Sequence, residues 1–452
     1  MRVAVVGGGI AGIAATERLG ALGHQAELFE AGPRLGGRIS AAALGEREIC
    51  LGGKNVGSRY RRFRELVEWR LEASYEKFGP DTGQLVHGRV RNLSFRSPRM
   101  RARLGTRLLL RGQARGGLRF LRLAKAVRED PDNAHLGSPV FADLAQETGD
   151  PSLPEYLGRE MCKDAVRHAT VRMNAAEPSE CHIGNFGTNL GLVVDRFEQL
   201  GGTALLDWIA AVEAANVVHA DSPIESLVAA GGEVRGVVEG DGSERGFEGV
   251  VLAVPAHQAA QLIGESDPEL ARLLCGVRYF PVGVVVAEYD RPAFPDAFAA
   301  LTAPAGMALS NAGSYGLEER HIVRYTFSGA PARALVEPDS FDPEARLAEA
   351  EDFLGRHAPV AGARRLRFAA RAFRPGLCAY RRDHACFLRE VAERLEGLTG
   401  LALAGDFMRG ASLEACVRSG QEAADAIVAG GGSRGAAAVS EREQIPAGSP
   451  PA

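Results

Sequence analysis

The N-terminal stretch Val3-Ala4-Val5-Val6-Gly7-Gly8-Gly9-Ile10-Ala11-Gly12 places a glycine-rich turn directly after a short apolar run. We expect residues 2–6 to form a buried parallel strand, because such strands are covered on both faces and are apolar throughout. The pattern predicts a helix over about residues 10–22 and a second strand over residues 25–30. In such a β-turn-α-β unit, the spacing G-x-G-x-x-G indicates a dinucleotide-binding fold.

Three glycines of this turn each have a physical role. Gly7 permits the tight turn, Gly9 lets the backbone approach a pyrophosphate, and Gly12 lets the helix pack closely on the strand. The pyrophosphate would lie at the helix N-terminus, where free N–H groups and the helix dipole favour anions. Glu30 ends the second strand, where its carboxylate can accept both hydroxyls of an adenosine ribose and disfavours the 2′-phosphate of NADP. This motif alone fits both NAD and FAD.

Two further elements decide between these cofactors. Arg34-Leu35-Gly36-Gly37-Arg38 follows Glu30 closely, and Leu403-Ala404-Gly405-Asp406 precedes Ser412-Leu413-Glu414 near the other end of the chain. With these elements the chain resembles the superfamily of flavin amine oxidases, protoporphyrinogen oxidases and phytoene desaturases. The resemblance implies that both ends of the chain fold onto one FAD molecule.

The resemblance also implies individual contacts with FAD. Glu30 would hold the adenosine ribose, and Arg38 would face the diphosphate, because a planar guanidinium pairs well with phosphate oxygens. Asp406 would accept hydrogen bonds from the ribityl side. The helix N-terminus at Ser412 and Leu413 would face the flavin pyrimidine oxygen and stabilise negative charge on the reduced ring. Together, the expected cofactor residues are Gly7, Gly9, Gly12, Glu30, Arg34, Gly36, Gly37, Arg38, Gly52, Gly53, Ile224, Gly405, Asp406, Ser412 and Leu413.

The implied fold is α/β, with a Rossmann-type, glutathione-reductase-like FAD-binding domain and a discontinuous α+β substrate domain. A length of 452 residues suits two or three domain-sized lobes. We expect residues 1–75, 200–265 and 395–430 to form the FAD-binding domain, and residues 76–199 and 266–394 to form the substrate domain. Gly, Ala, Ser and Pro dominate residues 431–452, which predicts a disordered tail.

The predicted chemistry is hydride transfer from a substrate C–H bond to flavin N5, which needs dry surroundings. Many amine oxidases of the superfamily carry a lysine in a second-domain strand, where it holds a water near N5. The similar segment here, residues 280–289, contains no lysine. This departure favours desaturation or ring oxidation of a small or apolar organic substrate, with O2 or another acceptor reoxidising the flavin.

Two alternatives stay open for the function. One is a flavin amine or amino-acid oxidase. The other belongs to a different class and is a redox-neutral, isomerase-like or binding protein that retains FAD.

Three side chains are candidates for catalytic roles. Lys54 follows Gly52 and Gly53 in a loop that the superfamily places near the flavin, so it can face N5 or the substrate; a surface or phosphate-contacting lysine is the alternative. Tyr380 is a candidate wall over the flavin. His384 is a candidate general base, although a histidine beside an aspartate is more often a structural hydrogen-bonding residue.

The segment 89–128 contains thirteen Lys or Arg residues, interleaved with leucines, and no Asp or Glu. Three interpretations stay open: a solvated helical face, peripheral contact with a membrane surface, and an arginine-lined entrance for acidic ligands. A formal net charge of −4 and the lack of a recognisable binding module argue against nucleic acid as a partner.

The seven cysteines are dispersed and form no CxxC motif, which is typical of reduced thiols and indicates neither a disulfide framework nor a metal site. No apolar run reaches the roughly 18 residues needed to span a bilayer. The first expected strand starts at residue 2, so we expect no signal peptide before it. We therefore expect a cytoplasmic protein.

Overall fold

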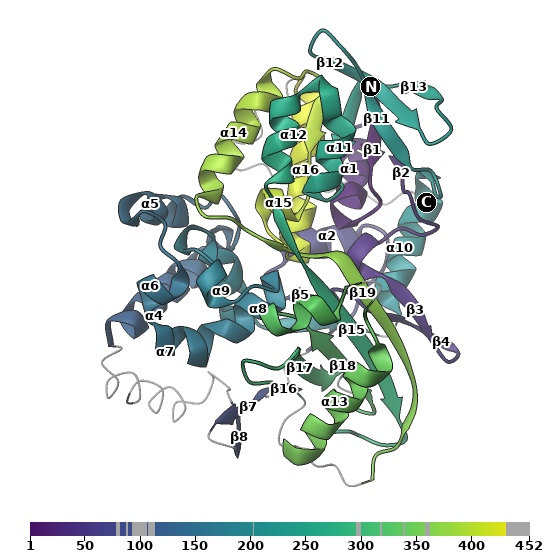
Figure 1. Cartoon of the computed structure of the whole chain (residues 1–452). Helices are drawn as coiled ribbons and strands as arrows, with labels where there is room; N and C mark the ends of the chain where they lie inside the picture. The colour runs from purple at the N-terminus through teal and green to yellow at the C-terminus, as the bar shows by residue number, and fades with distance from the viewer. Residues whose placement is uncertain are drawn as a thin grey trace.

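The computed structural model describes residues 1–77, 82–86, 89–92, 106, 114–201, 203–294, 300–316, 319–337, 340–357 and 362–430. Figure 1 shows three regions. A parallel sheet with helices on both faces lies at the top, a larger mixed sheet lies below it, and a lobe of helices lies at the left. The predicted tail over residues 431–452 and much of the basic segment 89–128 lie outside the described residues.

The parallel sheet brings together strands from both ends and the middle of the chain. Its five strands run in the order β10-β2-β1-β14-β20, and every neighbouring pair is parallel. Their bounds are Val217–His219 for β10, Gln25–Phe29 for β2, Arg2–Val6 for β1, Gly249–Leu252 for β14 and Leu401–Leu403 for β20. The order places β1, which leads into the glycine-rich turn, at the centre.

Strand β1 is apolar throughout because both of its faces are covered. Val3 and Val5 belong to a core formed with helices α1 (Ile10–Ala21), α2 (Arg61–Glu68), α10 (Ala204–Ala215) and α16 (Leu413–Val428). Ala4 and Val6 belong to the core on the opposite face, formed with α11 (Ala256–Ile263), α12 (Pro268–Cys275) and α14 (His384–Glu396). The period-two alternation of a strand thus serves two cores.

Helices α1 and α16 pack unusually closely, although they come from the two ends of the described chain. A Cβ added at Gly420 of α16 would lie 2.0 Å from the carbonyl oxygen of Ala11 in α1. Only a glycine allows this approach of two backbones. Helix α1 follows β1, and α16 comes after β20, both strands of the parallel sheet, so the N-termini of both helices lie toward the same edge of this sheet.

The second large sheet has seven strands in the order β19-β15-β18-β17-β16-β7-β8. Their bounds are Arg365–Ala379, Arg278–Tyr289, Ile322–Phe327, Leu309–Ser314, Ala300–Thr302, Thr82–Val86 and Arg89–Asn92, in the same order. The two longest strands, β15 and β19, pair in antiparallel fashion along almost their full length. Helix α13 (Pro343–His357) covers one face of this sheet and shares a core with it.

Smaller elements complete the described chain. The helical lobe contains α4 (Ala114–Glu129), α5 (Pro139–Thr148), α6 (Leu153–Leu157), α7 (Arg159–Met161), α8 (Arg167–Asn174) and α9 (Phe186–Val194). The remaining strands are β3 (Ala41–Leu44), β4 (Arg47–Cys50), β5 (Asn55–Gly57), β6 (Tyr75–Lys77), β9 (Phe197–Leu200), β11 (Ile224–Ala230), β12 (Glu233–Glu239) and β13 (Glu244–Gly246). Helix α15 is a single turn over Asp406–Arg409.

The structure confirms the predicted α/β fold class with its central parallel sheet. The helix predicted over about residues 10–22 is observed over Ile10–Ala21. The residue boundaries of the two predicted domains stay a proposal. Strands from residues 2–29, 217–252 and 401–403 do, however, meet in the parallel sheet.

Candidate cofactor and substrate site

The glycine-rich turn between β1 and α1 is tightly packed at both of its ends. The N–H group of Gly7 donates to the carbonyl oxygen of Phe29 at 2.8 Å, and Gly7 has a φ of 105°. A Cβ added at Gly12 would lie only 1.9 Å from the carbonyl oxygen of Gly7. Both positions therefore require glycine for the fold itself, whether or not a cofactor is bound.

Glu30 organises the end of β2 through backbone contacts. Its Oε2 accepts a hydrogen bond from the N–H of Gly8 at 2.8 Å, and its Oε1 accepts one from Gly32 at 2.9 Å. The carbonyl of Glu30 accepts from the N–H of Ser222, two residues before the predicted adenine contact Ile224. Each carboxylate oxygen keeps a free lone pair, since an ionised carboxylate has about four acceptor positions.

The Arg34–Arg38 segment packs directly on the glycine-rich turn. The N–H of Gly36 donates to the carbonyl oxygen of Gly8 at 2.8 Å. A Cβ added at Gly37 would lie 3.2 Å from the Cα of Gly9, and Gly37 has a φ of 52°. The two N-terminal motifs therefore form one surface, in which glycine serves both the backbone conformation and the close approach.

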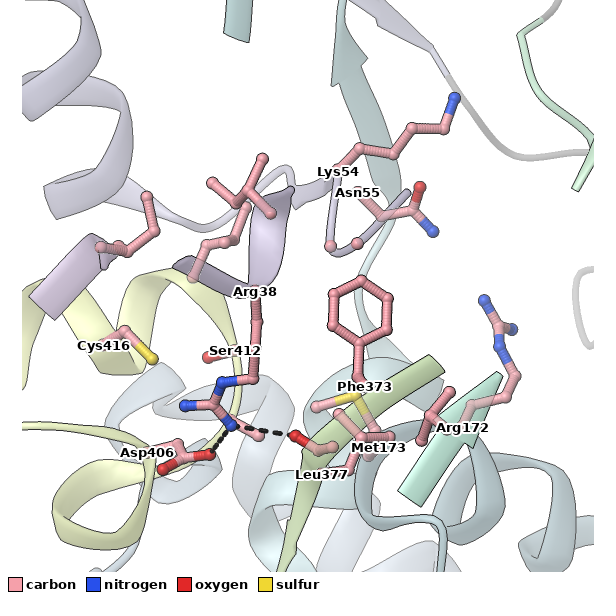
Figure 2. Close-up of a pocket in the computed structure, with 18 of the residues that line it drawn as sticks. Arg38, Lys54, Asn55, Arg172, Met173, Phe373, Leu377, Asp406, Ser412 and Cys416 are labelled. Carbon is pink, nitrogen blue, oxygen red and sulfur yellow. Dashed lines mark hydrogen bonds and ion pairs between the residues drawn. The ribbon is translucent and has the colours of Figure 1, made fainter. Parts of the chain in front are cut away.

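Arg38 joins this surface to the C-terminal motif. Its Nη1 donates to Oδ2 of Asp406 at 2.5 Å and to the carbonyl oxygen of Gly376 at 3.0 Å (Figure 2). The other carboxylate oxygen of Asp406 accepts from the hydroxyl of Tyr279 at 2.9 Å. Asp406 is buried, with 2% of its side chain exposed, so these two donors compensate the loss of its hydration.

The N-terminus of α16 is fixed by its own cap and in turn fixes α2. Oγ of Ser412 accepts from the N–H of Ala415 at 3.1 Å, which is the interaction expected of an N-cap serine. Glu414 is buried, and its carboxylate accepts from the N–H groups of Arg62 and Phe63 at 3.1 and 2.9 Å. These contacts satisfy free N–H groups in the first turn of α2.

A cavity of about 430 Å³ lies where these motifs meet the second sheet. This volume is within the usual range of roughly 300–1,000 Å³ for small-molecule sites. The predicted site residues that line it are Gly9, Gly36, Arg38, Gly52, Gly53, Lys54, Gly405, Asp406, Ser412 and Leu413. Figure 2 shows Asp406 and Cys416 on one side of the cavity and Arg172 on the other, with Phe373 between them in the view.

Two glycines on the cavity wall test whether the residues fit a bound nucleotide. A Cβ added at Gly9 or at Gly53 would meet no atom within 4 Å, and both residues line the cavity. Neither glycine is thus needed to avoid a clash within the protein. Their lack of a side chain keeps the cavity wall open, which fits the close approach of a cofactor to the backbone.

Lys54 lies on the cavity wall and is held from one side. Its Nζ donates to Oε1 of Gln199 at 2.7 Å and to the carbonyl oxygen of Tyr315, and it lies 3.4 Å from the centre of the Tyr315 ring. Burial, followed by the positive charge of Arg324, lowers the pKa of Lys54 to about 7. The Lys54 amine is therefore neutral in about half of the protein molecules near pH 7, and the neutral form can accept a proton.

Two arginines bring positive charge to the cavity. Arg172 comes from α8 and Arg324 from β18, and both line the cavity. Nη1 of Arg324 donates to the carbonyl oxygen of Gly52, whereas the guanidinium of Arg172 makes no hydrogen bond or ion pair with any residue that the structure describes. Burial lowers the pKa of Arg324 to about 10, and the charge of Arg172 contributes to that shift.

Comparison with known proteins identifies the family. Residues 10–428 match the family model described as flavin containing amine oxidoreductase. The chain belongs to this family. It is an FAD-dependent oxidoreductase, as the combination of N- and C-terminal motifs predicted.

Solved structures with the same fold cover most of this flavoprotein. A protein from Exiguobacterium sp., provisionally named a protoporphyrinogen oxidase, is 18% identical with a TM-score of 0.66 over 94% of this chain and 98% of that chain. Cyclohexylamine oxidase from Brevibacterium oxydans is 19% identical with a TM-score of 0.68 over 95% and 98%. Putrescine oxidase bound to putrescine is 16% identical with a TM-score of 0.68 over 95% and 99%. At these identities the likeness concerns the fold.

Some of the residues predicted to contact FAD do not line the cavity. Arg34 is exposed and pairs with Glu48 at 2.7 Å, so its guanidinium points to solvent rather than into the cavity. Gly7, Gly12, Glu30, Gly37 and Ile224 surround the glycine-rich turn and the end of β2 without lining the cavity. Their assignment to FAD stays a prediction.

Two of the three catalytic candidates do not reach the cavity. Tyr380, just before α14, and His384, the first residue of α14, are both buried, with 4% and 2% exposed, and neither lines the cavity. The Nε2 atom of His384 lies 2.9 Å from the carbonyl oxygen of Phe407, and its ring packs on Phe387. Burial lowers the pKa of His384 to about 4, which keeps it neutral near pH 7. This geometry corresponds to a structural histidine. A catalytic role for Tyr380 or His384 stays a prediction that the cavity lining does not support.

Other residues of the site were missed from the sequence. Arg172, Arg324 and Tyr279 come from separate elements, and only the fold brings them to the cavity or to Asp406. Arginine carries little signal in this chain, because only four of its 53 basic residues are lysines. The valine-rich segment 280–289 was recognised, and Val282 and Val284 of that segment do line the cavity.

None of the described helices is long and apolar enough to cross a membrane. Within α4, Leu118 and Leu121 are exposed, at 66% and 63%, whereas Phe120 and Leu123 are buried against the helical lobe. Contact of the 89–128 segment with a membrane surface stays a prediction.

Proposed function

We propose that this flavoprotein oxidises a C–H bond of an apolar organic substrate by desaturation or ring oxidation, with hydride transfer to FAD. The observation that carries the proposal is the wall formed by β15. Val282 and Val284 line the cavity from this strand, and residues 278–289 contain no lysine. A valine wall excludes water and provides no polar group for an amine.

The charge of the cavity also argues against a cationic amine. Among the described residues that line it, Asp406 is the one carboxylate. Its two oxygens already accept from Arg38 and Tyr279. A protonated amine would therefore find no free carboxylate and would meet the positive charges of Arg172 and Arg324.

The residues of the chain would divide the work. Bound FAD supplies the hydride acceptor. Phe373 and Leu377 of β19, together with Val282 and Val284, would hold the apolar substrate and keep water away. Lys54, with its pKa lowered to about 7 by burial, would accept the proton that the substrate loses.

The test is an anaerobic titration of the purified, FAD-loaded protein, followed by flavin absorbance. Apolar polyenes and reduced tetrapyrroles should bleach the flavin, whereas primary amines such as putrescine and cyclohexylamine should not. Bleaching by amines alone would overturn the proposal in favour of an amine oxidase. A flavin that no substrate bleaches, in a protein that converts one of these compounds to an isomer, would instead indicate a redox-neutral enzyme.

A further inference from the structure

We infer that the substrate of this enzyme carries a carboxylate, which the guanidinium of Arg172 binds with the charge of Arg324 in support. The inference rests on the proposed oxidation of an apolar substrate and adds the chemical class of its polar end. It concerns the side of the cavity that faces away from Asp406 (Figure 2).

The first argument is the position of Arg172. Its side chain comes from α8, lines the cavity and is partly buried. It has no ion pair or side-chain hydrogen bond among the described residues, although arginines elsewhere in the same lobe are paired. Arg167, one and a half turns earlier, forms two hydrogen bonds with Glu177, at 2.7 and 2.8 Å. Placing a charge in a cavity without a partner is costly, so a bound anion is the expected partner.

The second argument is that the neighbouring charges have the same sign. The charge of Arg172 contributes to the lowered pKa of Arg324, so the two guanidinium groups repel one another. Arg324 also contributes to the lowered pKa of Lys54. Three basic side chains that line one cavity create a local positive potential, which a bound anion would neutralise.

The third argument concerns the type of anion. Apolar side chains line the same cavity as these arginines, with Met173 beside Arg172 in sequence and Val282, Val284 and Phe373 from the sheet. An isolated inorganic anion gains nothing from such walls. A carboxylate attached to an apolar body would satisfy the arginine through a planar, two-point contact and would bury its remainder against the valines and the phenylalanine.

The experiment uses the FAD-loaded enzyme and two probes of the same shape. Benzoate carries the carboxylate, and benzamide is its neutral counterpart. Each is titrated against the wild-type enzyme, Arg172→Met, Arg172→Lys and the control Arg122→Met, which removes an exposed arginine of α4. Binding is followed by the perturbation of flavin absorbance, after FAD content has been measured for each variant.

We expect saturable benzoate binding to the wild type and much weaker benzamide binding. Arg172→Met should weaken benzoate binding by about 10- to 100-fold, the value of one charged hydrogen-bonded contact, and leave benzamide unchanged. Arg172→Lys should retain part of the affinity, and Arg122→Met should match the wild type. FAD content should be the same in all four proteins.

Three results would overturn the inference. They are equal binding of benzoate and benzamide to the wild type, unchanged benzoate binding in Arg172→Met, and loss of FAD in Arg172→Met, which would assign Arg172 to the cofactor. The anaerobic bleaching test is independent of this outcome. A carboxylate site can be present even if amines prove to be the substrates, as in an oxidation of amino acids.

Discussion

Nη1 of Arg38 lies 2.5 Å from Oδ2 of Asp406, although 368 positions separate the two residues in the chain. This ion pair connects the motif after β2 with the motif after β20. About a third of the Arg38 side chain is exposed, whereas Asp406 is almost fully buried. The pair therefore holds the two halves of the predicted cofactor site together and leaves one edge of the guanidinium accessible from the cavity.

The asymmetry in burial predicts unequal effects of removing each partner. Arg38→Met would leave the Asp406 carboxylate buried with Tyr279 as its remaining side-chain donor, and should lower the free energy of unfolding by about 2–3 kcal/mol. Asp406→Asn removes the buried charge and leaves a cation that water can reach, so its cost should be smaller. Urea denaturation of the FAD-free proteins measures both values. Equal destabilisation by the two substitutions would contradict the role assigned to burial.

Gly9 and Gly12 of the turn should behave differently when alanine replaces them. At Gly12 a Cβ would lie 1.9 Å from a carbonyl oxygen, so Gly12→Ala should cost at least about 2 kcal/mol of stability even without FAD. At Gly9 a Cβ would meet no protein atom within 4 Å. Gly9→Ala should therefore fold with a loss below about 1 kcal/mol but bind FAD poorly. The flavin-to-protein absorbance ratio and the melting temperature of the apoprotein separate the two effects; full FAD content in Gly9→Ala would refute this assignment.

Lys54 makes stability depend on pH in a defined direction. Its pKa is about 7 in the folded protein and 10.5 in an unfolded chain, so the unfolded state binds one more proton between these values. The free energy of unfolding should consequently rise with pH across this window through the contribution of Lys54. Lys54→Met should lack that contribution and should be most stabilising, relative to wild type, below about pH 7. Denaturation at about pH 7 and about pH 9 tests the sign. A stability difference that does not change with pH would mean that Lys54 stays protonated.

The same lowered pKa predicts a kinetic effect. The neutral amine of Lys54 becomes the major form above about pH 7, so the rate of flavin reduction by substrate should rise with pH through that value. Lys54→Met should be slower and should lose this step in the profile. Stopped-flow reduction under anaerobic conditions measures both. An unchanged rate and profile would remove Lys54 from the mechanism.

Glu414 provides a test of the contact between α16 and α2. Its two oxygens accept from the N–H groups of Arg62 and Phe63, so Glu414→Ala should leave both donors without this partner and cost about 1–3 kcal/mol. Glu414→Gln is the matched control, because its amide oxygen can still accept one of the two bonds. Its loss should be smaller. Chemical denaturation provides the comparison, and equal losses would show that side-chain shape rather than hydrogen bonding matters.

The sequence predicted the parts of this molecule that local chemistry determines. The turn of Gly7 to Gly12, the strand predicted over residues 2–6 and the helix N-terminus at Ser412 and Leu413 are each specified by residues a few positions apart. The family and the FAD cofactor followed from these local motifs. Glycine, in particular, is informative because few other reasons exist to place it at a strand-to-helix turn.

The remainder of the site depends on contacts between distant segments. Arg172 of α8 and Arg324 of β18 reach one cavity only because the helical lobe and the second sheet meet there. Periodicity and spacing carry no information on such a meeting. Tyr380 and His384 show the converse, because their proximity in sequence to the C-terminal motif suggested a role, whereas the fold buries both at the start of α14, outside the cavity lining.

The strand order of the parallel sheet has a consequence for folding during synthesis on the ribosome. Strand β20 pairs with β14, and α16 packs on α1, so the sheet and the Asp406 side of the predicted flavin site are completed by residues that are translated after about 400 others. Until then the backbone N–H and C=O groups along one edge of β14 are unpaired and can pair with a strand of another chain. Closing this edge and completing the flavin site are thus one late event. A nascent chain that ends before β20 therefore has an exposed strand edge and an incomplete predicted cofactor site.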